Sequence, residues 1–323
     1  MLLEVKNLYI DFEGMRGRTE AIKNIHFSLE KGEILGIVGE SGSGKSITAL
    51  SILGLLEENA IISNGEIIYN GRNLLRLQKK ERQLLRGREI GMVFQEPMTA
   101  LHPTMKIGKQ LQHVIQRHRN IPAKEAKEAV LQALQEVHID QPELVAKKYP
   151  FELSGGMRQR IVIALAMSAP PHLLIADEPT TALDVTIQYE ILNLIQELNR
   201  KRGTSVLLIT HDLGVVSKIC DRTIVMYAGE VVESGPTKEI LNRPNHPYTQ
   251  SLLEALPDSV SPGQPLRAIV GETPSLLQRP NGCAFATRCK YAMDICRNHH
   301  PKLAEKEVNH QAACWLEGTV SYD

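Results

Sequence analysis

The stretch from residue 32 to residue 56 most constrains the fold. The apolar run "GEILGIV" is followed by "GESGSGKS" and then by the helical text "ITALSILGLL". The middle segment fits G-x-x-x-x-G-K-[ST], in which glycines let backbone N–H groups curl around phosphates at a helix N-terminus. Lys45 is expected to reach the β- and γ-phosphates, and Ser46 to bind Mg²⁺. The segment therefore predicts a strand–loop–helix unit that binds nucleotide through Gly39, Glu40, Ser41, Gly42, Ser43, Gly44, Lys45, Ser46 and Ile47.

Further strand-like runs predict an α/β fold. Four short, apolar, β-branched runs resemble the one before the loop, and helical stretches separate them, at 89–95, 172–178, 205–211 and 222–228. Near-continuous apolar runs of this kind are typical of strands buried on both faces of a largely parallel sheet. By contrast, residues 2–12 and 21–30 alternate apolar and polar. These two segments are expected to be half-exposed antiparallel strands.

Two further segments differ from the strand-rich parts of the sequence, one in its helical pattern and one in its proline content. Residues 99–170 have helical character, and the clearest helix follows Pro122, with Ala126, Val130 and Leu134 at helical spacing. We interpret this segment as a helical insertion into the sheet domain. After residue 243 the text becomes rich in proline, which predicts a short helix and then a linker to a cysteine-bearing tail.

The composition of the chain bears on where the protein is located and on which class of partner it binds. Lys+Arg and Asp+Glu both number 37, so the formal net charge is zero. That balance argues against a protein that coats nucleic acid. No apolar run is long enough to cross a bilayer, and the first residues lack the pattern of a secretion signal. We therefore expect a cytosolic chain whose connection to a membrane is made through a partner.

A second motif complements the phosphate loop. In "HLLIADEPTTALD" an apolar strand ends in Asp177, which can hold Mg²⁺ directly or through water. Glu178 follows and is placed to orient or polarise an attacking water. Two adjacent carboxylates at the tip of a buried strand need a cationic partner, and Mg²⁺ with nucleotide provides one.

The segment "ELSGGMRQR" resembles the LSGGQ signature of the ATP-binding cassette (ABC) family, with Met157 in place of the glutamine. Other landmarks of the family match in order, and they are Gln95 (Q-loop), Asp184 (D-loop) and His211 (switch histidine). The resemblance covers residues 1 to about 240. It implies the ABC-ATPase variant of the P-loop NTPase fold, with a mainly parallel core, an N-terminal antiparallel β subdomain and a helical signature subdomain. The implied domains are a nucleotide-binding domain at 1–243 and a small Cys-rich extension at 244–323.

The resemblance also implies a mechanism. In this family ATP lies between the phosphate loop of one subunit and the signature of another, so Ser154, Gly155 and Gly156 are expected to face the partner's nucleotide. Glu178 is the expected catalytic base, Gln95 the residue that contacts Mg²⁺ or the water, and His211 the residue that holds the γ-phosphate. Asp184 joins the nucleotide-binding set. Phe12 is the best match to the adenine-stacking aromatic, with Tyr9 second, although either could be a core strand residue.

Three further segments are similar to the ATPase subunits of bacterial oligopeptide, dipeptide and nickel importers. They are "QEPMTALHP", "HPYTQSLLEALP" and the pattern C-x-F-x-x-R-C, which carries Arg288. This resemblance implies import of di- or oligopeptides, with nickel or another small solute as the alternative. It also implies a peripheral place on the cytoplasmic face of the membrane. The implied partners are two integral membrane permeases, an external solute-binding protein and a second cassette subunit, more often a paralogue than a copy. A soluble cassette protein of translation or DNA repair is disfavoured, because the chain has one cassette and no sustained heptads.

Four of the five cysteines lie in the last part of the chain, in the pattern C-x₅-C-x₆-C-x₁₇-C formed by Cys283, Cys289, Cys296 and Cys314. In a reduced compartment clustered thiols favour metal binding over disulfides. Four thiolates suit zinc or an iron–sulfur cluster, and the paired C-x₂₋₄-C knuckles common in zinc folds are absent from the sequence. The family resemblance leans toward a [4Fe–4S] cluster. We favour the cluster over zinc, with a disulfide pair third, and expect Cys220 to be a buried, inert thiol.

Overall fold

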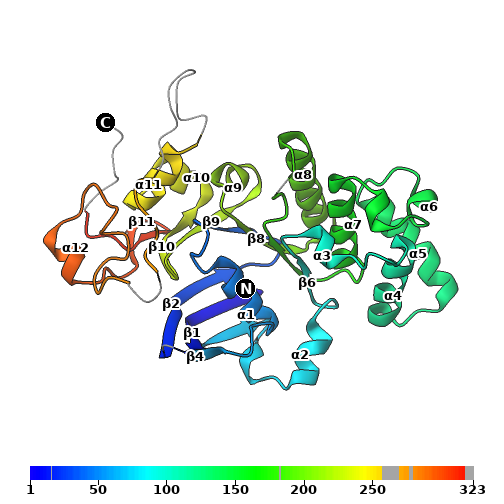
Figure 1. Cartoon of the computed structure of the whole chain (residues 1–323), viewed down its shortest axis with the longest axis horizontal. Helices are drawn as coiled ribbons and strands as arrows, with labels where there is room; N and C mark the ends of the chain where they lie inside the picture. The colour runs from blue at the N-terminus through cyan, green and yellow to red at the C-terminus, as the bar shows by residue number, and fades with distance from the viewer. Residues whose placement is uncertain (16, 182, 257–268, 276–278, 317–323) are drawn as a thin grey trace. The chain divides into compact units, whose positions relative to one another are not determined.

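A computed structural model of the chain describes residues 1–15, 17–181, 183–256, 269–275 and 279–316. It contains two compact units (Figure 1). The first is formed by residues 1–29, 34–76 and 210–323, and the second by residues 30–33 and 77–209.

The first unit begins with an antiparallel sheet. Its strand order is β2-β1-β4-β5, made by β1 (Leu3–Gly14), β2 (Gly17–Leu29), β4 (Ala60–Tyr69) and β5 (Arg72–Asn73), with the 3₁₀ turn η1 (Leu74–Arg76) after it. The two predicted half-exposed strands are confirmed as β1 and β2, since they pair antiparallel and β1 alternates buried and accessible residues over most of its length. β4 and β5 were not among the predicted strands.

Further strands of this unit pair in the order β11-β12-β10-β9-β3. They are β3 (Ile34–Val38), β9 (Arg222–Tyr227), β10 (Glu230–Pro236), β11 (Ala304–Glu307) and β12 (His310–Ala312). As predicted for two buried runs, β3 and β9 pair parallel, whereas the other pairs are antiparallel. The β9–β10 hairpin turns at Ala228 and Gly229, whose φ angles are 46° and 81°. Two positive φ values in a row suit a two-residue hairpin turn.

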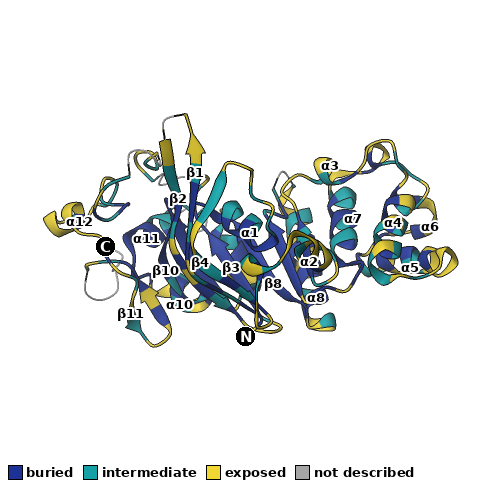
Figure 2. Cartoon of the chain, turned by 90° about the horizontal axis from the view of Figure 1, so that it is seen from below, coloured by how far each residue is buried: buried dark blue, intermediate teal, exposed yellow. Residues whose placement is uncertain are grey.

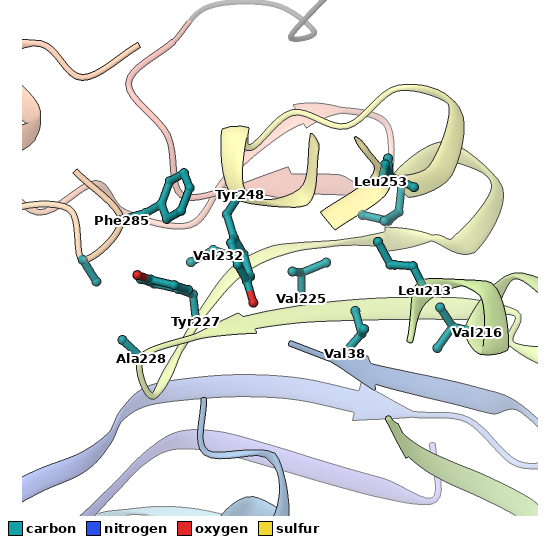
Figure 3. Packing of buried hydrophobic residues seen from close by; sticks show 12 residues of the cluster. Val38, Leu213, Val216, Val225, Tyr227, Ala228, Val232, Tyr248, Leu253 and Phe285 are labelled. Atoms are coloured by element: carbon teal, nitrogen blue, oxygen red, sulfur yellow. The ribbon is translucent and has the colours of Figure 1, made fainter. Parts of the chain in front are cut away.

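The helices of the first unit are α1 (Lys45–Leu53), α9 (Leu213–Ile219), α10 (Thr237–Asn242), α11 (Pro247–Glu254) and α12 (Asp294–Asn298). The predicted short helix after residue 243 is α11, and most of the predicted linker, residues 257–268, lies outside the described residues. One buried cluster joins β9 to α11 and to the cysteine-bearing segment, through Tyr227, Tyr248 and Phe285 (Figure 3). The cysteine-bearing segment therefore shares a core with the strands of this unit.

The second unit contains the parallel strands β6 (Ile90–Val93), β7 (Leu173–Asp177) and β8 (Ser205–Thr210), paired in that order. β7 and β8 are buried along their whole length, and the ribbon of β8 is dark blue in Figure 2. These strands confirm the three predicted parallel runs. The long helix α8 (Val185–Arg202) connects β7 to β8, so this connection is a βαβ crossover.

The rest of the second unit is helical. Its elements are α2 (Lys79–Leu85), α3 (Pro97–Ala100), α4 (Ile107–Arg119), α5 (Ala123–Glu136), α6 (Pro142–Val145), the 3₁₀ turn η2 (Pro150–Glu152) and α7 (Gly155–Met167). The predicted helix after Pro122 is confirmed as α5, whose inner face buries Ala126, Val130 and Leu134. None of the helices within the described ranges combines the length and apolar character that a bilayer crossing demands.

Candidate nucleotide-binding site and cysteine site

The phosphate loop connects β3 to α1 in a conformation that requires glycine. Gly42 and Gly44 have φ angles of 79° and 98°, a backbone conformation that is strained for residues other than glycine. A Cβ atom on Gly39 would lie 2.1 Å from the carbonyl oxygen of Met226. Lys45 is 5% exposed, and its Nζ donates to the carbonyl oxygens of Gly39 (2.7 Å) and Glu40 (3.0 Å). The loop thus combines a buried cation with a helix N-terminus, as a phosphate site requires.

The remaining predicted nucleotide contacts of the first unit are accessible to different degrees. Ser41 is exposed, while Ser46 and Ile47 are half-buried in the first turn of α1. Phe12 is half-buried on β1, opposite Thr19 and Ala60, and Tyr9 on the same strand is also half-buried. The adenine-stacking role of Phe12 stays a prediction.

The predicted carboxylate pair lies at the end of β7 in the second unit. Asp177 is buried, and Glu178 takes a left-handed φ of 47° while its N–H donates to the Ile209 carbonyl oxygen at 2.8 Å. The Glu178 carboxylate accepts hydrogen bonds from Gln95 Nε2 (3.0 Å) and from Thr181 Oγ1 (2.8 Å). Gln95 and Glu178 meet although 83 residues separate them, because parallel β6 and β7 end at the same edge. Thr181 was missed, and its sequence signal is the "PTT" that follows the carboxylates.

The signature segment begins α7. The Ser154 hydroxyl caps this helix by accepting from the Met157 N–H at 3.3 Å, so the departure from glutamine leaves this backbone contact in place. A Cβ atom on Gly156 would lie 2.8 Å from Ile187 Cγ2 of α8, which explains the small residue. Asp184 caps α8, since its Oδ1 accepts from the Ile187 N–H at 2.9 Å.

His211 belongs to the first unit. It is exposed and follows β8 directly, and it borders a pocket with Leu252 and Leu256 near α11. The next residue, Asp212, caps α9 by accepting from the Gly214 N–H at 2.7 Å. The phosphate loop and His211 thus form part of the first unit, whereas the carboxylates, Gln95 and the signature belong to the second.

The four tail cysteines line one cavity, together with His246, Phe285 and Trp315 among others. Burial raises the pKa of the Cys283 thiol to about 12 and that of Cys289 to about 11, and the thiols of Cys296 and Cys314 add to both shifts. Burial likewise raises the pKa of Cys314. All five cysteines are free thiols, so the disulfide alternative is not observed. Across the described residues, no three His, Cys, Asp or Glu side chains form a group compact enough to hold one metal ion.

The fifth cysteine, predicted to be buried and inert, is half-buried. Cys220 packs against the core of the first unit, and burial strongly raises the pKa of its thiol. A buried thiol of raised pKa carries little thiolate and reacts slowly.

Two features define a P-loop ATPase of the cassette type. One is the phosphate loop that follows the buried strand β3, and the other is the hydrogen bond from Gln95 to Glu178, the carboxylate that follows β7. The sequence matches the family described as "ABC transporter" over residues 22–181, and the one described as "Oligopeptide/dipeptide transporter, C-terminal region" over residues 232–296. The chain belongs to the ABC transporter family.

Curated relatives of nearly full length narrow this placement. The chain is 49% identical to the oligopeptide transport ATP-binding protein OppD of Bacillus subtilis, over 98% of this chain and 88% of the relative. It is 48% identical to the dipeptide transport ATP-binding protein DppD of Lactococcus lactis, over 98% of this chain and 90% of the relative. It is also 48% identical to a probable peptide ABC transporter ATP-binding protein of Sinorhizobium fredii, over 99% and 96%.

Solved structures confirm the ABC-ATPase fold. A dimeric ATP-binding cassette, MJ0796, in a post-hydrolysis state bound to ADP and Pi matches 73% of this chain and 99% of its own. The TM-score is 0.66 and the identity 28%. CbiO1 of Clostridium perfringens, part of the transporter complex CbiONQ, matches with a TM-score of 0.65 and 29% identity, over 74% of this chain and 90% of its own.

Proposed function

We propose that this chain is the ATP-hydrolysing subunit of a membrane importer of di- or oligopeptides. The single observation that carries the proposal is the hydrogen bond between Gln95 and Glu178, which joins two cassette landmarks at the edge of the sheet. The peptide substrate is supported by the oligopeptide and dipeptide names of the relatives and by the match at the C-terminal region. Nickel is the alternative cargo within the same group.

The proposed chemistry is in-line attack of water on the γ-phosphate, with cleavage of its bond to the β,γ-bridging oxygen and departure of ADP. Lys45 would neutralise the β- and γ-phosphates, and Ser46 with Asp177 would hold Mg²⁺, which supplies charge neutralisation when bound. Glu178 would accept the proton of the water. Two donors, Gln95 and Thr181, hold the Glu178 carboxylate in one orientation, so it needs little reorganisation before it acts.

We propose that the active unit is a dimer with two composite sites. The phosphate loop of one subunit would face Ser154, Gly155 and Gly156 of the other, where the N-terminus of α7 offers backbone N–H groups to the γ-phosphate. Asp184 would lie near the same interface, and His211 would hold the γ-phosphate. Support comes from the likeness to a cassette whose structure is described as dimeric.

The assembly follows from this function. The partner cassette would be a paralogue or a second copy, and two integral membrane permeases with an external solute-binding protein would complete the importer. The chain would then work at the cytoplasmic face of the cell membrane as a peripheral subunit, with a cassette domain at 1–243 and an extension at 244–323.

The substitution Glu178→Gln tests the chemistry. It should preserve MgATP binding and lower the rate of phosphate release by about 10²- to 10⁴-fold, the contribution of a positioned general base. The nucleotide-bound protein should accumulate as a dimer in size-exclusion chromatography with light scattering. Glu190→Gln, which removes an accessible carboxylate paired with Arg160, is the matched control and should hydrolyse ATP normally. Near-normal hydrolysis by Glu178→Gln would remove Glu178 from its role.

Cargo and assembly need a separate experiment. Co-expressed with its neighbouring transport genes and reconstituted in vesicles, the complex should accumulate labelled di- or oligopeptide in the presence of ATP. Accumulation of Ni²⁺ without peptide would favour the nickel alternative. Full ATPase velocity at concentrations where every subunit is monomeric would refute the composite site.

We further propose that the four tail cysteines bind a [4Fe–4S] cluster, with zinc as the alternative. Their thiols line one cavity, and four thiolates are the donor set of either group, although binding would have to draw them closer together than they lie in this structure. Such a group would cross-link the segment and contribute to its folding free energy. Protein purified without oxygen should be brown and contain iron and sulfide, whereas colourless protein with stoichiometric zinc would establish the alternative. Cys220→Ser is the control that should leave the metal content unchanged.

A further inference from the structure

The phosphate loop contains a carboxylate, Glu40, which electrostatics disfavours in a site for a polyanion. Arg288, from the cysteine-bearing segment, neutralises it. Arg288 Nη1 lies 2.6 Å from Glu40 Oε2, and Arg288 Nη2 lies 3.0 Å from Glu40 Oε1. Thr273 Oγ1 adds a hydrogen bond to Glu40 Oε2 at 2.9 Å. A fork of two parallel hydrogen bonds to a carboxylate fixes both charge and geometry.

Carbonyl oxygens and aromatic rings hold the guanidinium of Arg288 in place. The side chain is 4% exposed, and its Nε and Nη2 also donate to the carbonyl oxygens of Val270 (3.1 Å) and Ile269 (3.4 Å). It lies over the rings of Tyr227 and Phe285, 5.7 and 5.9 Å from their centroids. Because the surroundings fix the guanidinium, they also fix the position of the Glu40 carboxylate.

A residue of α11 holds the backbone of the loop. The Glu40 N–H donates to the hydroxyl of Tyr248 at 2.8 Å. Tyr248 is fully buried, and Figure 3 shows its ring between β9 and α11, close to the rings of Tyr227 and Phe285. The ring centroids lie 4.6 and 5.3 Å away. The first half of the phosphate loop is therefore held at both the backbone and the side chain of Glu40.

Charge explains why this contact matters for nucleotide. Burial alone would raise the pKa of Glu40, but hydrogen bonds from Arg288 and Thr273 and the charges of Arg288 and Lys45 lower it. Glu40 is thus ionised and within electrostatic reach of Lys45. Without Arg288, the Glu40 carboxylate would compete with phosphate for the charge of Lys45.

We infer that Arg288 is a positioning residue for ATP, which neutralises Glu40 and fixes the phosphate loop so that the C-terminal segment forms part of the nucleotide site. This inference rests on the proposed function, since it takes ATP as the ligand of the loop. It adds that the loop of this chain depends on residues outside the cassette landmarks.

The test is a double-mutant cycle on the full chain, with the dissociation constant of MgATP as the readout. Arg288→Gln leaves Glu40 uncompensated and should weaken MgATP binding about tenfold. The double variant E40Q/R288Q removes both charges and should bind within about threefold of the wild type. The deficit of Arg288→Gln should also shrink as salt is raised, because it is partly electrostatic. Lys290→Gln is the matched control: it removes one positive charge two positions along the same segment, where Lys290 forms an exposed pair with Glu254, and should leave affinity unchanged.

Several outcomes would overturn the inference. One is wild-type affinity in Arg288→Gln, and another is equal weakening in Arg288→Gln and the double variant, which would show that Arg288 only stabilises the fold. If Arg288→Gln does not fold, Arg288→Lys keeps the charge without the fork. It should then bind more weakly than wild type and be rescued by low salt, and wild-type binding at every salt concentration would reject the inference. Failure of the wild type itself to bind MgATP is a distinct result, because it refutes the proposed function.

Discussion

Tyr248→Phe removes one oxygen atom from the support of the phosphate loop and keeps the ring. In the wild type the hydroxyl accepts the Glu40 N–H at 2.8 Å, and the residue is fully buried. Burial raises the pKa of Tyr248, so the hydroxyl stays protonated and available as a neutral acceptor. An N–H that loses its acceptor costs about 1–3 kcal/mol when it is buried, and this range is the upper bound for the part-buried Glu40 N–H, while the ring contacts with Tyr227 and Phe285 remain. We therefore expect a loss of stability of up to this size together with weaker MgATP binding.

Urea unfolding of the full chain, followed at several wavelengths, measures the first effect, and equilibrium MgATP titration measures the second. The midpoint should fall without a change in slope, because the surface exposed on unfolding hardly changes. Tyr291→Phe is the control. It removes the same atom from a half-buried ring that lies under Lys290 in the cysteine-bearing segment, whereas the Glu40 N–H donates to Tyr248. Identical unfolding midpoints and affinities in Tyr248→Phe and the wild type would show that the hydroxyl does not support Glu40.

Two further predictions concern pH. Burial lowers the pKa of His246 to about 3, so the folded state holds this histidine neutral and stability is lost as pH falls below about 6.5 toward 3. His246→Asn should remove that loss while still capping α11 at the Tyr248 N–H, and equilibrium unfolding between about pH 7 and about pH 4, which covers most of the interval between the two pKa values, would detect it. Burial alone would raise the pKa of Glu230, but the hydrogen bond and charge of His300, with the charges of two basic neighbours, lower it. Its stabilising effect is present above the ordinary pKa of 4.5 and lost as pH falls further, so Glu230→Gln should flatten the acid limb of the stability curve below pH 4.5, and an unchanged limb would contradict this.

The sequence predicts those strands whose burial on both faces produces a continuous run of apolar residues. β3, β7 and β8 are buried along their whole length, so each is a run of apolar, β-branched residues. β10 and β12 give no such pattern, because β10 carries Glu230, Glu233 and Ser234 among its apolar residues and β12 has only three residues. Glu233 and His310 look like surface residues in the sequence, yet both are fully buried and bonded at 2.7 Å, and Glu233 also accepts the Asn245 N–H. Satisfied buried polar groups of this kind cannot be found from periodicity.

The same distinction divides the candidate site. Residues fixed by local motifs, such as Lys45 after the glycines and Glu178 after β7, are predictable because loop chemistry demands that order. The meeting of Gln95 with Glu178 follows from parallel strand order. The pairing of Glu40 with Arg288 spans 248 residues, and nothing in either local sequence indicates it. In the sequence Arg288 is only one position of a cysteine pattern.

That position has a thermodynamic consequence. Arg288 precedes Cys289, and the rings of Phe285 and Tyr227 form the wall against which the guanidinium lies. Whatever orders this segment therefore also sets the position of the Arg288 fork. If an ordered segment raises the affinity of the phosphate loop for MgATP, then by linkage bound MgATP must stabilise the ordered segment by the same free energy. Because these loop contacts run through the carboxylate and the backbone N–H of Glu40, the coupling depends on what Arg288, Thr273 and Tyr248 contribute, and substitutions at these three residues should change its size.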